Sequence, residues 1–105
     1  MYKLCFFVPE SHLSEVKAVL FEVGVGKIGN YDQCCWQAKG IGQFRPLAGS
    51  SPAIGDQGQL EQLDEWKVEM VCDDALIRQA VAALLLAHPY EEVAYETWQV
   101  NQLPE

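Results

Sequence analysis

The alternation of apolar and polar residues along the chain predicts four β-strands. Residues 2–8 are apolar and β-prone and run up to Pro9, so we expect the first strand there. Between residues 66 and 72, apolar side chains alternate with charged ones, which is the period of a strand with one face in water. Two further apolar segments, 31–37 and 93–100, complete the set of expected strands.

Helical periodicity marks two other segments. Apolar residues recur every three or four positions over residues 13–23, between Ser11, which we expect to cap the helix, and Gly24, which we expect to end it. A second apolar stripe covers residues 76–85 and ends before Pro89. Each stripe predicts a helix that packs one face against the sheet.

The order of these elements predicts an α+β fold. Residues 38–62 are rich in Gly, Pro, Ser and Gln, so we expect a long loop in which 41–47 forms a short strand at most. With no internal repeat or linker, residues 1–105 form one domain. Two β-α-β halves with right-handed crossovers give a ferredoxin-like βαββαβ sandwich, an antiparallel sheet with two helices on one face.

Composition and charge exclude several classes of partner. The chain has 105 residues, 50% of them hydrophobic, and a formal net charge of −8. Its seven Lys and Arg residues are scattered singly, so we expect neither nucleic acid nor an anionic membrane as a partner. The N-terminus reads as a strand rather than a signal peptide, and the longest apolar run, 80–87, is too short to span a bilayer. These features predict a soluble cytoplasmic protein.

The four cysteines favour reduced, structural thiols. Cys5 and Cys72 fall inside expected strands, and Cys34 and Cys35 are adjacent, with no C-x-x-C pair in the chain. The alternative is that Cys34 is a nucleophile, which would need a base within reach. The three tryptophans, at positions 36, 66 and 98, fall on three expected strands and would form core or a subunit interface if they shared one face.

Residues 24–29 match the dinucleotide fingerprint G-x-G-x-x-G, but they follow a helix instead of preceding one. The helix dipole therefore presents its negative end, and we interpret the glycines as a helix end and a tight turn. A second interpretation stays open, in which the turn amides with Lys27 and Asn30 bind an anion.

The densest polar cluster is His88-Pro89-Tyr90-Glu91-Glu92, at the end of the second helix. An imidazole beside carboxylates can bind a divalent metal, with His88, Glu91 and Glu92 as ligands, or can transfer a proton. The alternative is a helix end and a turn in which one of the acids pairs locally. With His12 the only other histidine, a closed tetrahedral site within one chain is disfavoured.

Four ordered motifs together resemble a known family. They are GVGKIGNYDQC (24–34), GIGQFRP (40–46), PAIGDQGQLE (52–61) and HPYEEVAY (88–95). They resemble the small inserted domain of the YqfO-like, or Nif-three-like, family. The resemblance implies a free-standing domain of CutA/PII type, which assembles as a trimer. The two-metal site of full-length relatives lies in flanking sequence that is not present here, so a hydrolase-like activity is not carried over.

We therefore expect a non-enzymatic, homo-oligomeric regulatory or ligand-binding module, with a trimer favoured over a dimer. The pocket would join the turn at 26–31, the segment at 44–46 and residues 88–92, either within one chain or between subunits. Its candidate ligand-binding residues are Gly26, Lys27, Gly29, Asn30, Tyr31, Phe44, His88, Tyr90, Glu91 and Glu92. Acidic residues on the flanking segments favour a cationic ligand or a divalent metal over a phosphate.

Two alternatives stay open. One is a small enzyme that uses His88 with Glu91 or Glu92 as acid and base, or Cys34 as a nucleophile. The other is a structural domain that docks onto a protein partner through its sheet.

Overall fold

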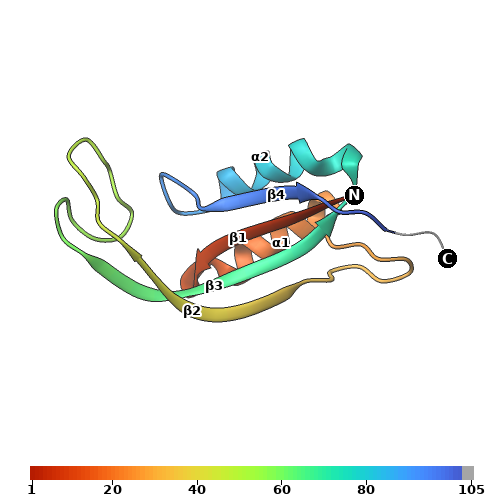
Figure 1. The fold of residues 1–105 in the computed structure, drawn as a ribbon, viewed down its shortest axis with the longest axis horizontal. Helices are drawn as coiled ribbons and strands as arrows, with labels where there is room; N and C mark the ends of the chain where they lie inside the picture. Colours follow the sequence, from red (N-terminus) through yellow and green to blue (C-terminus); the bar gives the residue numbers. More distant parts are fainter. Residues whose placement is uncertain (103–105) are drawn as a thin grey trace.

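The computed structural model describes residues 1–102 and forms one four-stranded sheet covered on one face by two helices (Figure 1). The elements are β1 (Tyr2–Pro9), η1 (Glu10–His12), α1 (Leu13–Val23), β2 (Trp36–Phe44), β3 (Glu61–Cys72), η2 (Asp74–Leu76), α2 (Ile77–Ala87) and β4 (Tyr95–Gln99). The strand order is β2-β3-β1-β4, and all neighbours are antiparallel. This is the ferredoxin-like arrangement, so the predicted fold class is confirmed. No helix within residues 1–102 is long and apolar enough to cross a membrane.

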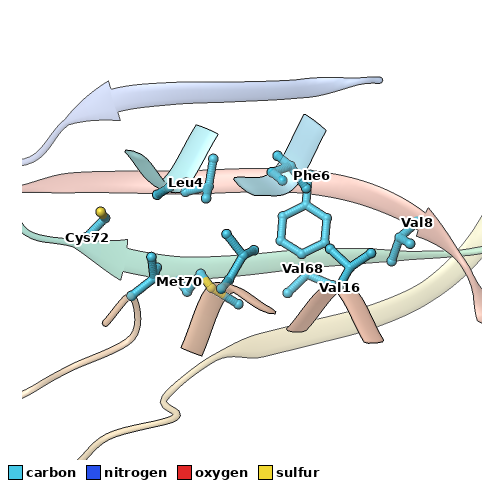
Figure 2. Packing of buried hydrophobic residues seen from close by; sticks show 11 residues of the cluster. Leu4, Phe6, Val8, Val16, Val68, Met70 and Cys72 are labelled. Carbon is cyan, nitrogen blue, oxygen red and sulfur yellow. The ribbon is translucent and has the colours of Figure 1, made fainter. Parts of the chain in front are cut away.

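The core lies between the helices and one face of the sheet (Figure 2). Cross-strand pairs place Leu4 beside Met70, and Phe6 beside Val68, on the face that the helices cover. The core residues that are fully buried (0% exposed) are Leu4, Phe6, Val8, Val16, Leu20, Val68, Ala80 and Leu84. Because strands alternate with period two, Glu65, Lys67 and Glu69 of β3 turn to the opposite, helix-free face.

The two ends of α1 differ in how well the sequence predicted them. Gly24 ends the helix as expected, with φ at 109° and its amide donating to the carbonyls of Leu20 and Phe21. Ser11 does not cap it, which corrects the prediction. The chain first makes the short helix η1, and the Ser11 hydroxyl instead contacts Nδ1 of His12, with 2.8 Å between the two atoms.

The long loop predicted at 38–62 is shorter than expected, which is the main correction to the expected fold: residues 38–44 and 61–62 belong to strands, and 45–60 remain a loop. β2 and β3 pair over nine positions, from Trp36 opposite Glu69 to Phe44 opposite Glu61. The glycines of β2 lower its own strand propensity, but the ladder of hydrogen bonds to the amphipathic β3 compensates. The strand expected at 31–37 forms only at its end, where Trp36 and Gln37 begin β2. Residues 31–35 are irregular, apart from one isolated bridge between Ile28 and Tyr31. Only residues 45–60 connect the two strands.

The three tryptophans do not share one face. Trp36, on β2, and Trp98, on β4, lie on the helix-free face, and their side chains are 60% and 41% exposed. Trp66 lies on the helix-covered face, where it is opposite Val8. The open face of the sheet therefore carries exposed aromatic side chains near both of its edges.

Candidate functional site

The predicted site residues lie at two opposite ends of the sheet (Figure 1). The turn at 26–31 lies where β1 begins, and the Gly26 amide donates to Val71 of β3 at 2.8 Å. The segment at 88–92 lies where β1 ends, and Tyr90 donates to Glu65 of β3 at 2.9 Å. The two contacts are six positions apart on β3, about 20 Å of strand. The three predicted segments therefore do not form one pocket within one chain. A pocket that joins them between subunits stays a prediction.

Two of the three predicted segments do meet. A cavity of about 430 Å³ lies between the connection from β2 to β3 and the connection from α2 to β4. Its walls come from residues 43–47, 50, 52–54, 90–92 and 94, with Phe7 of β1 and Glu65 of β3. We call this cavity the loop cleft. Phe44, Tyr90, Glu91 and Glu92 line it, as the sequence predicted.

Tyr90 is fixed in the loop cleft by contacts on both sides. Its hydroxyl donates to Oε2 of Glu65, and its ring lies against those of Phe44 and His88, with centroids 6.1 Å and 4.8 Å apart. Burial, and then the bond to Glu65, raises the pKa of the Tyr90 hydroxyl. The phenol is therefore a hydrogen-bond donor at neutral pH, and it ties the cleft wall to β3.

His88 supports this wall from behind. It is 6% exposed; Nε2 lies 2.7 Å from the carbonyl oxygen of Phe7, and Nδ1 accepts the Tyr90 amide at 3.1 Å. Since one nitrogen must accept, the arrangement selects the neutral tautomer with its proton on Nε2. Burial lowers the pKa of His88, against the opposing effects of the Phe7 carbonyl and Glu65.

Both ring nitrogens of His88 are thus engaged by the protein, and neither is free to bind a metal. In the described part of the chain, no three His, Cys, Asp or Glu residues are grouped as metal ligands. The metal site predicted from His88, Glu91 and Glu92 is therefore not formed within one chain. Glu91 instead accepts the Ser51 amide at 3.0 Å, which links the two connections at the cleft.

The lowered pKa of His88 has a consequence for stability. The unfolded chain, with an ordinary histidine pKa of about 6.5, binds a proton more readily than the folded one, so stability is retained above that pKa and lost as pH falls below it. We expect the free energy of unfolding to fall between pH 7 and pH 5, with this residue contributing at most about 1.4 kcal/mol per pH unit. Urea unfolding at a series of pH values measures the slope.

The variant His88→Gln removes the titrating ring, so its slope over this pH range is expected to be smaller than that of the wild type. The matched control is His12→Gln, which removes the only other histidine and leaves His88 in place. Equal slopes for the wild type and His88→Gln would contradict the neutral, buried state of His88.

One residue of the loop cleft, Glu65, belongs to no motif that the sequence alone could reveal. Glu65 falls on the polar face of β3 and looks like any solvated charge, but its carboxylate lies over the backbone of Gly42 on β2. A Cβ at Gly42 would overlap that carboxylate. The absence of a side chain at Gly42 is thus what gives Glu65 its place. The only signal in the sequence was the unusual pair of glycines at 40 and 42 inside a β-capable segment.

The turn at 26–31 is closed by its own backbone. The amides of Ile28 and Tyr31 donate to each other's carbonyl oxygens at 2.9 Å, and the Cys34 amide donates to the Gly26 carbonyl oxygen at 2.8 Å. Lys27, Gly29 and Asn30 are exposed beside them. A role for this turn in ligand binding stays a prediction, separate from the loop cleft.

Cys34 lies beside that turn, at the opposite end of the sheet from His88. Its thiol lies 3.6 Å from the Asp32 carbonyl oxygen. His12 precedes α1, whereas Cys34 follows the far end of the same helix. The structure therefore pairs Cys34 with neither histidine.

Comparison with known proteins connects this chain to longer ones. No family model matches it. The chain is 43% identical over 98 residues to a protein of Halalkalibacterium halodurans and 40% identical over 102 residues to one of Bacillus subtilis, both named GTP cyclohydrolase 1 type 2 homolog. The matches cover 93% and 97% of this chain, but 26% and 27% of the relatives. This chain spans about a quarter of their length.

A solved structure, that of a Bacillus cereus protein related to NIF3, superposes with a TM-score of 0.81 at 38% identity. The match covers 96% of this chain and 26% of that one. The chain is homologous to one segment of the NIF3-related family. The resemblance that the four motifs predicted is thereby confirmed.

The same fold occurs in smaller proteins. CutA1 from Pyrococcus horikoshii matches with a TM-score of 0.68 at 18% identity, over 100% of this chain and 88% of that one. The PII-like protein CutA from Nostoc sp. PCC 7120 matches with a TM-score of 0.67 at 15% identity, over 96% and 82%. At these identities the likeness shows the fold alone, so this segment of the NIF3-related proteins has a CutA-like fold.

Proposed function

We propose that the chain is a regulatory module that binds a small molecule in the loop cleft and catalyses no reaction itself. The observation that supports this most is the cavity of about 430 Å³, in which residues from three separate parts of the chain meet. Small-molecule sites are typically about 300–1,000 Å³, mostly apolar, with a few placed polar groups. The loop cleft has this size and this kind of lining.

The enzyme alternatives find less support in the geometry. A general acid or base needs a nitrogen or oxygen free to exchange a proton with a substrate, and both nitrogens of His88 are engaged. Cys34 lies at the other end of the sheet from that imidazole. The role that fits His88 is to hold Tyr90 in the cleft wall.

The relatives supply a context for regulation. Proteins named GTP cyclohydrolase 1 type 2 homolog are about four times as long as the matched segment. Any activity that their name implies is therefore an activity of the whole protein, and we do not assign it to this segment. In such a protein, this segment would sense a ligand for the remainder of the chain. A divalent cation held by Glu91 and Glu92 stays a second candidate, since both carboxylates line the loop cleft.

Self-association is part of the proposal. Trp36 and Trp98 are 60% and 41% exposed on the helix-free face, an arrangement that an interface would cover. We propose a homo-oligomer, with a trimer favoured over a dimer. Sedimentation equilibrium gives the mass directly. A chain that stays monomeric at all concentrations would favour the docking alternative, in which the sheet covers a different protein.

The cleft itself can be tested by filling it. Ala53 lines the loop cleft, whereas Ala48 lies in the same connection outside the lining. We expect a compound from a panel of nucleotides, amino acids, organic amines and divalent metals to raise the Tm of the wild type. At ten times its Kd, a ligand stabilises by about 1.4 kcal/mol, or several degrees for a chain of this size.

The variant Ala53→Trp is expected to abolish that shift, and Ala48→Trp to retain it. The wild-type panel is read by differential scanning fluorimetry and every positive compound is repeated on both variants. If Ala53→Trp keeps the full shift, the ligand binds elsewhere. If no compound shifts the wild type, the proposed function is wrong.

A further inference from the structure

We propose that the ligand of the loop cleft is a small organic cation, an ammonium group on an apolar or aromatic body. This rests on the proposed function and specifies the chemistry of its ligand. The inference comes from three features of the cleft: its apolar walls, its excess of carboxylates, and the fixed position of one of them, Glu65.

The walls suit an apolar body. Phe7, Phe44, Pro46 and Ile54 contribute rings and aliphatic carbons from three parts of the chain. The rings of Phe44 and Tyr90 are tilted by 53°, with centroids 6.1 Å apart, so they present faces and edges rather than a closed stack. An aromatic face attracts a cation lying within about 6 Å of its centroid. The same walls thus accept both parts of such a ligand.

The charges in the lining favour a positive group. Three carboxylates, those of Glu65, Glu91 and Glu92, face one guanidinium, that of Arg45. The chain as a whole has a formal charge of −8, which attracts cations from solution. Arg45 is exposed at the end of β2, and Glu91 already accepts the Ser51 amide. The ammonium group is therefore best placed at Glu65, deeper in the lining.

Glu65 is held for such a contact. The hydroxyl of Tyr90 donates to its Oε2, and its carboxylate lies over Gly42, where no side chain competes for the space. A carboxylate already held in one geometry loses little freedom on binding, which favours affinity. Oε1 then supplies the acceptor for an ammonium N–H, with the ring of Tyr90 beside it.

Two other ligand classes fit less well. A phosphate or carboxylate would meet one exposed arginine and three carboxylates. A divalent metal needs several converging oxygen or nitrogen ligands, and residues 1–102 contain no group of three that could hold one. An organic cation needs a single carboxylate and apolar contacts, which is what the loop cleft offers.

The test compares two probes that share a phenyl ring and differ in charge. The ¹⁵N-labelled chain is titrated with phenethylammonium chloride and, separately, with sodium phenylacetate at the same ionic strength. We expect phenethylammonium to move the amide signals of the non-proline residues in 44–47, 50–54 and 90–94 with saturation. We expect phenylacetate to bind at least about tenfold more weakly.

The matched variants are Glu65→Gln and Glu69→Gln. Both lie on β3 and on the same face, but Glu69 pairs with Lys67 and does not line the cleft. Glutamine at 65 still accepts the Tyr90 hydroxyl, so the fold is preserved while the charge is lost. We expect Glu65→Gln to lower the affinity for phenethylammonium about tenfold to a hundredfold, which is the range of a charge-assisted contact. We expect Glu69→Gln to leave that affinity unchanged.

The other outcomes separate the two proposals. If phenylacetate binds in the cleft more tightly than phenethylammonium and Arg45→Gln abolishes this, the cleft is an anion site: the inference is overturned and the proposed function stands. If Glu65→Gln and Glu69→Gln lower the affinity for phenethylammonium equally, the negative charge of the whole surface attracts the cation and Glu65 has no special role. This outcome also overturns the inference. If Mn²⁺ but neither organic probe moves these signals, the site is for a metal and the inference is again overturned. If none of the three probes moves them, the inference is overturned, and the wider panel of compounds decides separately on the proposed function.

Discussion

Truncation of Leu84 to alanine is expected to lower the free energy of unfolding by about 2–5 kcal/mol, the range observed for buried leucines. Leu84 is 0% exposed and lies on α2, within the cluster that joins both helices to β1 and β3. Removing its side chain loses apolar burial and leaves a cavity that a close-packed core fills only partly. Urea unfolding followed by circular dichroism measures the change.

The same helix contains a matched control. Leu86 lies two residues further along α2 and is 90% exposed, so its truncation removes almost no buried surface. We expect Leu86→Ala to change stability by no more than about 0.5 kcal/mol, since alanine also favours helix slightly more than leucine does. Equal losses for the two variants would contradict the packing, and would indicate that the outer face of α2 is covered by another chain.

The contrast between these two leucines shows what the sequence could predict about the fold. Apolar spacing correctly placed α2 and the helix-covered face of β3, because each period follows from backbone geometry. It failed for β2, where glycines at 40 and 42 suggested a loop. The strand there depends on pairing with β3, a contact between segments distant in sequence that no local pattern reports.

The sequence likewise predicted some residues of the loop cleft and missed others. Phe44, Tyr90, Glu91 and Glu92 carried recognisable motifs and do line the cleft. Glu65 was missed because its role depends on Tyr90, twenty-five positions away in sequence. The turn at 26–31 was joined to the wrong segments because a motif gives no information about which end of the sheet it reaches. The direction of α1 decides that, by carrying the chain back to where β1 begins.

Replacement of Gly26 by alanine is expected to be the second most damaging change, at about 2–5 kcal/mol, the sum of a conformational and a packing cost. Gly26 has φ at 81°, a left-handed conformation that costs other residues about 1–2 kcal/mol. A Cβ there would also lie 2.6 Å from the Cys34 carbonyl oxygen and 3.1 Å from the ring of Phe21. The carbonyl belongs to the backbone and cannot rotate away, so overpacking adds about 1–3 kcal/mol.

Gly29 separates the two causes, because it has φ at 57° but no atom within 4 Å of the position that a Cβ would take. Gly29→Ala therefore meets only the conformational cost, which is partly offset by the lower entropy of the unfolded chain, and we expect a loss of about 1 kcal/mol or less. Chemical denaturation of both variants gives the comparison. A large loss at Gly26 with a small one at Gly29 would mean that close backbone contact between 26 and 34 holds the end of α1 against β3. Equal losses would contradict that contact and leave the left-handed turn alone as the reason for both glycines.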